Sequence, residues 1–310
     1  MRDVIVAGER GLVAVGGCRT DAAGVGLAWS SADGADWTRL TETDFDIQLR
    51  SAVSDPTGET LVFVGDGEDE LRAMALLLNG GSAPSVATLP TDLDTTSVYS
   101  VDAHPELGYL AVGVGYEGSP EGPALAQAWL LAPPYDGEWL AVEPPADARA
   151  FSDVLALDGG MLVAGVTGEF TAGTWQWDSR SWSVAQPIAQ AEADDPGEIE
   201  QVTPGLLLAD QALWAATADG WELQHRFEVQ GSISSVALMH EGLIAVGRSE
   251  EGDQPMIVLT SVDGIDWRQA SQLPDYQGDL VRKLVAYAPD IVVGVGIGTV
   301  WQGPGQATDW

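Results

Sequence analysis

The sequence is poorest in the residues that build disulfides, metal sites and cationic surfaces. Its 310 residues include one cysteine, three histidines and 13 Lys+Arg, and Lys283 is the one lysine. The lone Cys18 excludes an intrachain disulfide framework and a thiolate metal site. Histidines are too few to favour a metal hydrolase, and His104 and His240 are expected in turns. We therefore expect no cofactor, and a weakly bound calcium ion is the one exception that the acidic loops leave open.

Long apolar runs are also missing. None reaches the roughly 18 residues of a membrane helix, so we expect no direct membrane insertion. We expect residues 1–4 to enter the first repeat at once and not to form a signal peptide, and we expect residues 4–7 to form the first strand. The 47 Asp+Glu residues give a formal net charge of −34, and a surface of that sign repels nucleic acid. The charge favours a protein partner, one with a basic surface among the options, and a glycan is the alternative.

What the sequence does have is a repeated unit. Seven apolar runs each end in a small residue, at positions 16, 65, 113, 165, 209, 247 and 294. A period of about 40–50 residues is typical of β-propellers, with one four-stranded sheet per repeat. Runs without polar alternation favour strands covered on both faces. We therefore predict an all-β, single-domain, seven-bladed β-propeller of four-stranded antiparallel blades. The predicted blades cover approximately 1–46, 47–94, 95–146, 147–195, 196–230, 231–277 and 278–310.

A second motif occurs twice, as Ser-x-Asp-Gly-x-x-Trp. Its residues are Ser31, Asp33, Gly34 and Trp37 in one copy, and Ser261, Asp263, Gly264 and Trp267 in the other. Asp-Gly suits a tight turn, because Gly takes a positive φ and Asp accepts nearby backbone N–H groups. The tryptophan is expected to pack where neighbouring sheets meet.

This motif resembles the Asp-box of bacterial-neuraminidase repeats, which occurs in sialidases, sortilin-like receptors and photosystem II assembly factors. It departs from that pattern by one residue deleted before the Gly and by the missing Thr before the Trp. The resemblance implies structural turns between the two outer strands of a blade, and it is nearly silent on activity.

Enzyme chemistry finds little support in the sequence. A sialidase would need an Arg-Ile-Pro signature and a cluster of arginines, whereas Arg50 and the pair Arg282-Lys283 provide two cationic sites near the axis. No Gly-x-Ser-x-Gly elbow and no phosphate loop followed by a helix is present. Pairs of carboxylates are too common among 47 acids to identify a glycosidase. We therefore predict no catalytic residues.

The long loops and the axial mouth on one face are the predicted binding surface. The candidate binding residues are Phe45, Arg50, Tyr99, Tyr116, Phe151, Phe170, Tyr276, Arg282 and Lys283. Those expected at the axis are Arg50, Tyr99, Phe151, Arg282 and Lys283. One acidic loop, with Asp66, Glu68, Asp69 and Glu70, has the oxygen count of a calcium loop without its spacing, so a solvated loop is the preferred interpretation.

The predicted function is that of a non-catalytic binding or scaffold propeller that contacts a protein through its acidic loop face and axial mouth. Two alternatives stay open, a carbohydrate-binding or glycosidase-like propeller and a structural subunit of a larger envelope or extracellular assembly. The excess of acid and scarcity of lysine suit an extracellular or cell-envelope protein and, as an alternative, the cytoplasm of a halophile.

Overall fold

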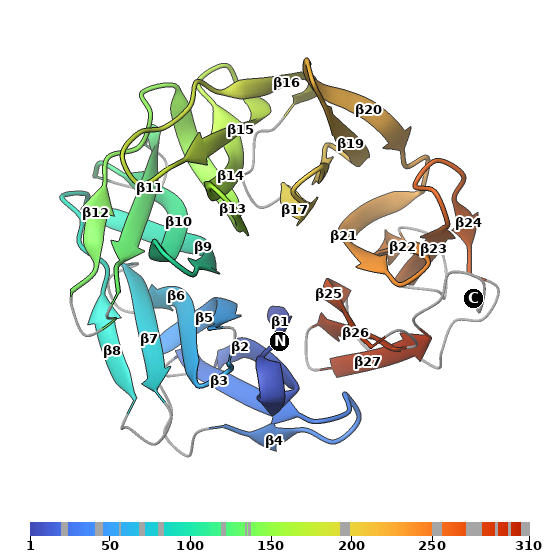
Figure 1. Cartoon of the computed structure of the whole chain (residues 1–310), viewed down its shortest axis with the longest axis horizontal. Coiled ribbons are helices and arrows are strands. Elements are labelled where there is room, and N and C mark those ends of the chain that lie inside the picture. The colour runs from blue at the N-terminus through green and yellow to red at the C-terminus, as the bar shows by residue number, and fades with distance from the viewer. Residues whose placement is uncertain are drawn as a thin grey trace.

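A computed structural model describes residues 1–19, 24–40, 46–55, 57–67, 72–79, 84–118, 122–133, 135, 138–192, 199–249, 256–270, 281–288, 291–296 and 299–304. These residues form antiparallel sheets arranged as a ring around a central axis (Figure 1). The strands of each sheet follow one another along the chain, with the first strand nearest the axis and the last strand on the rim. The fold is therefore an all-β, single-domain β-propeller.

We number the sheets 1 to 7 in chain order. Sheets 1 and 2 are β1 (Asp3–Val6), β2 (Leu12–Arg19), β3 (Gly24–Ser31), β4 (Thr38–Arg39) and β5 (Ile47–Ser54), β6 (Thr60–Gly67), β7 (Ala73–Asn79), β8 (Ser85–Thr88). Sheets 3 and 4 are β9 (Thr95–His104), β10 (Gly108–Tyr116), β11 (Ala124–Leu131), β12 (Leu140–Val142) and β13 (Ala148–Leu157), β14 (Gly160–Thr167), β15 (Thr171–Trp177), β16 (Gln186–Glu192).

Sheets 5 and 6 are β17 (Glu200–Thr203), β18 (Leu206–Ala209), β19 (Ala212–Thr217), β20 (Gly220–Arg226) and β21 (Gly231–Met239), β22 (Gly242–Ser249), β23 (Met256–Ser261), β24 (Arg268–Gln269). Sheet 7 is β25 (Val281–Ala288), β26 (Ile291–Gly296) and β27 (Thr299–Pro304). One short 3-10 helix, η1 (Gly8–Arg10), links β1 to β2.

The prediction of seven four-stranded blades is wrong. Among the described residues, the structure has six four-stranded blades, and the last sheet has three strands. The repeated small residue lies in or beside the second strand of each sheet, so counting it counts inner strand pairs. That count carries no information about whether an outer strand completes each sheet.

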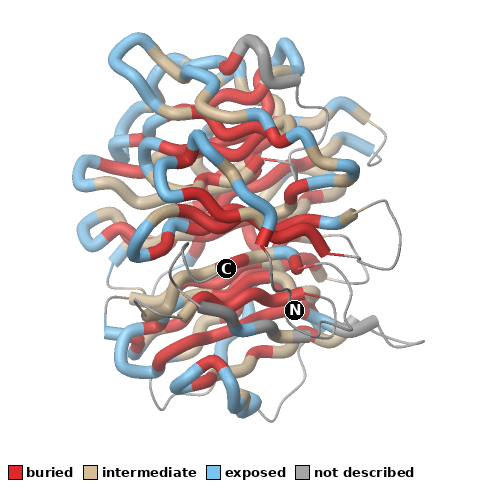
Figure 2. The backbone as a smooth tube through the Cα atoms, turned by 90° about the vertical axis from the view of Figure 1, so that its right-hand side faces the viewer, coloured by how far each residue is buried: buried red, intermediate tan, exposed pale blue. Residues whose placement is uncertain are grey.

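The core lies in the seams between neighbouring sheets, as the buried strands of Figure 2 show. In β2, Leu12, Val13, Ala14 and Val15 are all fully buried. Leu12 and Ala14 pack toward sheet 7, whereas Val13 and Val15 pack toward sheet 2. Each central strand therefore faces a neighbour on both sides, which explains why these runs are continuously apolar.

The ring closes where sheet 7 packs against sheet 1. Val4 and Leu12 form one buried cluster with Val293 and Val295. The Met1 nitrogen donates a hydrogen bond to the Gly296 carbonyl at 2.6 Å. Apolar packing and hydrogen bonds join these two sheets, and no strand is exchanged between them among the described residues.

Glycine in the second strand has a steric reason. A Cβ added to Gly113 would lie 2.0 Å from the Ser97 carbonyl oxygen, and one added to Gly165 would lie 2.1 Å from that of Ala150. In both sheets the innermost strand carries a β-bulge directly after the residue paired with this glycine. The bulge brings the two backbones too close together for a side chain.

Two of the seven predicted positions depart from that rule. Sheet 5 carries Ala209 in place of glycine, and the register of its inner pair shifts farther along, between Gln201 and Thr203. In sheet 7 the residue that pairs before the bulge is Gly296, opposite Val281, so the glycine at the bulge lies two residues beyond Gly294, where the apolar run ends. Gly294 lies one strand period earlier on the same face of β26.

Candidate functional site

In five sheets a β-bulge in the innermost strand places a side chain at the axis. The bulged residues are Arg50, Tyr99, Ser152, Ser234 and Arg282. The residues that follow the bulge are Ser51, Ser100, Asp153, Ser235 and Lys283, and Asp3 and Glu200 pair at the same register in sheets 1 and 5. A bulge rotates a side chain out of the alternating pattern, so equivalent positions in neighbouring sheets face one another across the axis.

These residues line a pocket of about 170 Å³ at the end of the ring where the inner strands begin. Its lining residues are Arg2, Asp3, Arg50, Ser51, Tyr99, Ser100, Ser152, Asp153, Ile199, Glu200, Ser234, Arg282 and Lys283. The structure therefore brings together four of the predicted binding residues, namely Arg50, Tyr99, Arg282 and Lys283. We call this pocket the axial mouth.

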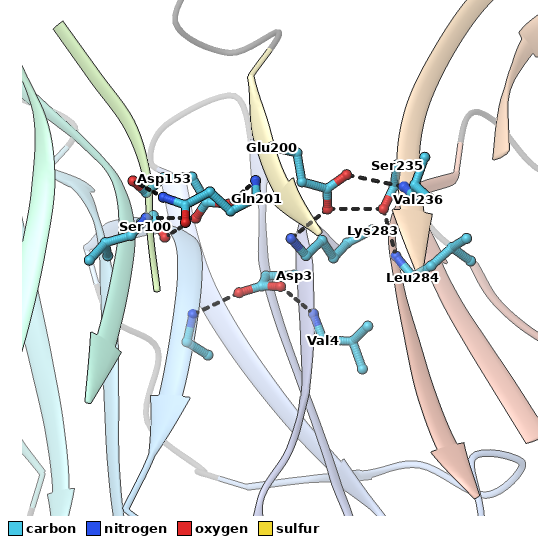
Figure 3. A network of polar contacts seen from close by, with 12 residues as sticks. Asp3, Val4, Ser100, Asp153, Glu200, Gln201, Ser235, Val236, Lys283 and Leu284 are labelled. Atoms are coloured by element: carbon cyan, nitrogen blue, oxygen red, sulfur yellow. Dashed lines mark hydrogen bonds and ion pairs between the residues drawn. The ribbon is translucent and has the colours of Figure 1, made fainter. Parts of the chain in front are cut away.

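Two carboxylates of the axial mouth link neighbouring sheets through hydrogen bonds (Figure 3). Asp3 in sheet 1 accepts the backbone N–H of Ala52 in sheet 2 at 2.9 Å. Asp153 in sheet 4 accepts the backbone N–H of Gln201 in sheet 5 at 2.8 Å and the hydroxyl of Ser100 in sheet 3 at 2.6 Å. Burial raises the pKa of Asp3 above its ordinary value, although these hydrogen bonds and Lys283 oppose the rise.

Glu200 is the third such carboxylate. It accepts the backbone N–H of Val236 at 3.2 Å, the hydroxyl of Ser235 at 3.1 Å and the ammonium of Lys283 at 2.6 Å. Burial by itself would lower the pKa of Lys283, but Glu200, Asp153 and Asp3 together raise it above its ordinary value. Lys283 is thus held as a cation within a structural network that spans sheets 5, 6 and 7 (Figure 3).

The arginines of the axial mouth are arranged differently. Arg2, Arg50 and Arg282 come from sheets 1, 2 and 7, which are adjacent in the ring. Arg50 forms an ion pair with Asp66 and lies over the ring of Tyr99, with 5.1 Å between its guanidinium carbon and the ring centroid. Burial lowers the pKa of Arg2, and the charges of Arg50 and Arg282 lower it further. The three guanidinium groups therefore repel one another. Such grouping of like charges is common at functional sites.

Several polar groups in or beside the axial mouth have no partner. The hydroxyl of Ser152 and the Nε of Arg50 are buried without a hydrogen bond in the described part of the chain, and so is the side-chain oxygen of Gln201. Ser152 is only 7% exposed. A buried polar atom without a partner costs free energy, so its presence in a pocket points to a ligand or water.

The other predicted binding residues do not join the axial mouth. Phe151 is fully buried between Trp175 and Trp182 in the core of sheets 3 and 4, so its predicted axial position is wrong. Phe170 is 45% exposed at a loop, where the guanidinium carbon of Arg149 lies 4.1 Å from its ring centroid. Tyr116, at the end of β10, packs partly buried against the cluster between sheets 4 and 5. Phe45 and Tyr276 lie outside the described residues.

The structure describes one acidic residue of the predicted acidic loop, Asp66, which lies in the interior. Asp66 is 6% exposed and accepts the backbone N–H of Val98 in addition to its ion pair with Arg50, so it is an interior residue. Glu68, Asp69 and Glu70 lie outside the described residues. Within the described part of the chain, no group of three or more His, Cys, Asp or Glu side chains is placed to hold a metal ion. His104 accepts the backbone N–H groups of its own turn.

The two Ser-x-Asp-Gly-x-x-Trp turns have the same internal bonds. The hydroxyl oxygen of Ser31 accepts the N–H of Gly34 at 2.8 Å, and that of Ser261 accepts the N–H of Gly264 at 2.8 Å. The indole of Trp37 donates to the Gly34 carbonyl at 2.9 Å, and the indole of Trp267 to the Gly264 carbonyl at 3.0 Å. Asp33 and Asp263 each accept two further backbone N–H groups. Both turns connect the two outer strands of their sheets.

Sequence reasoning missed Arg2, Ser152, Asp153 and Glu200 as members of the axial mouth. It counted two cationic sites near the axis, whereas Arg2 adds a third. A signal was present, because each bulge reads as an apolar residue, a variable residue and a polar residue at the start of an inner strand. The separation between each of these residues and its marker glycine varies from 12 to 15 residues, so aligning the repeats on their glycines would not by itself have placed them in one column.

Comparison with solved structures supports the fold. The WD40 propeller domain of Doa1 has 15% identity and a TM-score of 0.59, covering 100% of this chain and 94% of that chain. YCF48 bound to a D1 peptide has 14% identity and a TM-score of 0.59, covering 98% and 90%. A candidate 6-phosphogluconolactonase from Bacteroides fragilis has 10% identity and a TM-score of 0.62, covering 95% and 90%.

No family model matches the chain, and no curated protein sequence matches it. In the described residues there is no helix of the length and hydrophobicity required to span a membrane. At these identities the likeness to solved structures shows a β-propeller fold, and it does not extend to the Asp-box resemblance or to an activity. Function must therefore be argued from the axial mouth.

Proposed function

We propose that this chain is a non-catalytic binding propeller whose axial mouth engages a protein partner. The observation that carries the proposal is the residue content of the axial mouth. Equivalent positions of the sheets hold different side chains there, and the side chains of Arg2, Arg282 and Ser152 form no ion pair or hydrogen bond with a described residue. A position that repeats in backbone but varies in side chain is free to specify a partner, because the fold does not depend on its identity.

The carboxylates argue against catalysis at this site. Asp3, Asp153 and Glu200 each use both oxygens to accept hydrogen bonds from their own or neighbouring sheets. A general acid or nucleophile needs a carboxyl group directed at the substrate. These groups are directed into the seams between sheets, which gives them a structural role.

A carbohydrate-active propeller is the second candidate. It is favoured by one observation, the presence of three carboxylates and the ring of Tyr99 in a single pocket. Tyr99 could stack on a sugar. That candidate would require one of the three carboxylates to leave its backbone partner when substrate binds.

A photo-crosslinking experiment tests the proposal. The chain would carry p-benzoylphenylalanine in place of Tyr99 at the axial mouth, or in place of Val86, which is 45% exposed on the outer strand β8. We expect one protein, identified by mass spectrometry and then purified, to form a 1:1 adduct through position 99 and none through position 86.

An adduct through position 86 alone would favour the structural-subunit alternative, in which blade edges make the contacts. Absence of a protein adduct at both positions would overturn the proposal. Binding to a glycan array by the same purified chain would then favour the carbohydrate alternative.

A further inference from the structure

We infer that the axial mouth is a carboxylate-binding site in which Arg2 and Arg282 hold the anion. This inference rests on the proposed function, because the carboxylate would belong to the protein partner, as a side chain or a C-terminus. Its basis is the combination of three adjacent arginines, two of which form no ion pair with a described residue, with buried polar atoms that lack partners in the described part of the chain.

The three arginines come together because of the ring geometry. Sheet 7 contributes Arg282 and sheet 2 contributes Arg50, both at the bulge, while sheet 1 between them contributes Arg2 at the residue before β1. Four of the chain's 13 basic residues, counting Lys283, line this one pocket. Such a concentration is unexpected in a protein whose net charge is −34.

The three guanidinium groups differ in what they contact. Arg50 is fixed by its ion pair with Asp66 and by the ring of Tyr99. Neither Arg2 nor Arg282 forms an ion pair or a side-chain hydrogen bond with any described residue. The charge of Asp66 offsets only part of the repulsion on Arg2, and a bound anion would relieve the remainder.

At the positions equivalent to the arginines the other sheets are neutral. The carboxylates of Asp3, Asp153 and Glu200 also line the pocket, and they already accept hydrogen bonds from neighbouring sheets and from Lys283. Sheets 4, 5 and 6 contribute Ser152, Ile199 and Ser234, at the positions equivalent to the arginines. The hydroxyl of Ser152 and the Nε of Arg50 are buried donors without acceptors among the described residues. An oxyanion supplies acceptors, whereas a cationic ligand would leave these donors unpaired and would be repelled by the arginines.

Charge favours a single carboxylate over a more highly charged anion. The pocket, of about 170 Å³, has room for a carboxylate and the atoms that carry it. The excess of acid over the whole molecule opposes each additional negative charge on the ligand. Guanidinium groups bind carboxylates through two parallel hydrogen bonds, which suits a planar monoanion.

The test uses N-acetyldiglycine, which ends in a carboxylate, and its C-terminal amide, which does not. Each is titrated at constant ionic strength into the full chain labelled with 15N, and the Nε–H signals of the arginines are followed by NMR. We expect saturable shifts at Arg2 and Arg282 with the acid and none with the amide. Inorganic phosphate is expected to bind more weakly than the acid.

Substitutions assign the effect to the site. We expect Arg2→Gln and Arg282→Gln each to weaken binding of N-acetyldiglycine by at least about tenfold, since each removes a charge-assisted contact. Arg226→Gln is the matched control, because Arg226 pairs with Asp210 on sheet 5 and is absent from the axial mouth. It should bind as the unsubstituted chain does. Circular dichroism and thermal unfolding verify that each variant is folded.

Equal shifts with the acid and the amide, tighter binding of phosphate, or unchanged affinity in both Arg2→Gln and Arg282→Gln would overturn the inference. Different outcomes of these experiments test the proposed function. An adduct through position 99 that persists in both arginine variants would keep the protein-binding function and reject the carboxylate. Carboxylate binding without any protein adduct would instead indicate a small-molecule anion.

Discussion

The rim and the axial mouth are both built from repeated positions, but they use repetition differently. On the rim, the turns at Ser31–Trp37 and Ser261–Trp267 have the same Ser, Asp, Gly and Trp residues, and the bonds that join Ser to Gly and Trp to Gly agree in length within 0.1 Å. At the axial mouth, the same bulge recurs in five sheets while its residue is Arg, Tyr or Ser. Repeated side chains thus belong to the scaffold, and repeated backbone with varied side chains marks the surface available for recognition.

Carboxylates sharpen this comparison. On the rim, Asp33 and Asp263 accept two backbone N–H groups each in full solvent, and these bonds lower the pKa of both side chains. Asp102, in β9, also accepts two backbone N–H groups, from Ala103 and from Ala156 of sheet 4. Burial nevertheless raises the pKa of Asp102 to about 6. The same bonding pattern therefore gives opposite shifts, because desolvation penalises the charged form only in the interior.

The largest expected effect tests the bulge itself. Gly165→Ala would place a Cβ 2.1 Å from the Ala150 carbonyl oxygen, so the strands must separate or the bulge must be lost. We expect the free energy of unfolding to fall by about 3 kcal/mol in urea denaturation. Gly205→Ala is the control, because no atom lies within 4 Å of the added Cβ. A loss similar to that control would mean that the bulge does not require glycine.

The rim tryptophans are expected to contribute less than fully buried rings would. Trp37 and Trp267 are half-buried and each donates one hydrogen bond within its own turn. We expect Trp37→Ala and Trp267→Ala each to lower the free energy of unfolding by about 2 kcal/mol, below the range for a fully buried tryptophan. Trp267 also packs edge-on against Phe227, with ring centroids 5.0 Å apart, so its loss should be the larger of the two by about 0.5–1.5 kcal/mol in urea denaturation. Equal losses would show that this ring contact contributes nothing beyond the turn itself.

The strand positions and the rim turns could be predicted from the sequence, whereas the axial mouth could be predicted only in part. The small residues at 16, 65, 113, 165 and 247 located the second strands, because the close approach of two backbones admits only glycine at those positions. The Asp-Gly turns were predicted because their bonds are local and their residues repeat. Both signals are written in the sequence within a few residues of the feature they specify.

The axial mouth was harder to predict because a bulge shifts the register by one residue. Phe151 was expected at the axis and instead lies in the core, while the next residue, Ser152, faces the pocket. A shift of one residue moves each side chain to the other face of the strand. A strand predicted at the right place but with a misplaced bulge therefore assigns core residues to the site and site residues to the core. Arg2 was missed for a related reason, since it precedes β1 and lay outside the predicted first strand.

The pH dependence of Asp102 offers a test of intermediate size. Below the ordinary pKa of about 3.8, the carboxyl is protonated in both the folded and unfolded states and carries no penalty. As the pH rises to about 6, the unfolded state ionises first, so the contribution of Asp102 to stability is lost, and the loss is complete above that pH. A shift of about two pKa units corresponds to at most about 3 kcal/mol, and partial exposure reduces it to about 1–2 kcal/mol.

Comparison with Asp102→Asn isolates this contribution. Asparagine loses one hydrogen-bond acceptor at every pH, so that loss is constant. The free energy of unfolding of the unsubstituted chain minus that of the variant should therefore fall between pH 4 and pH 6 and then level off. Urea denaturation at each pH would measure it, and a difference independent of pH would show that Asp102 keeps its ordinary pKa.

The smallest expected effect is a change in the free energy of unfolding whose sign differs between Arg2→Gln, at the proposed recognition site, and Arg226→Gln, in the scaffold. Arg2→Gln removes one of three repelling charges and no ion pair, so the free energy of unfolding at low salt should rise by up to about 1 kcal/mol. Arg226→Gln removes an exposed ion pair with Asp210 and should lower it by up to about 1 kcal/mol. Added NaCl should shrink both differences, because it screens exposed charges. Thermal and urea unfolding at low and high NaCl measure the two variants together. If Arg2→Gln were destabilising at low salt, Arg2 would have a structural partner and the axial mouth would resemble the rim.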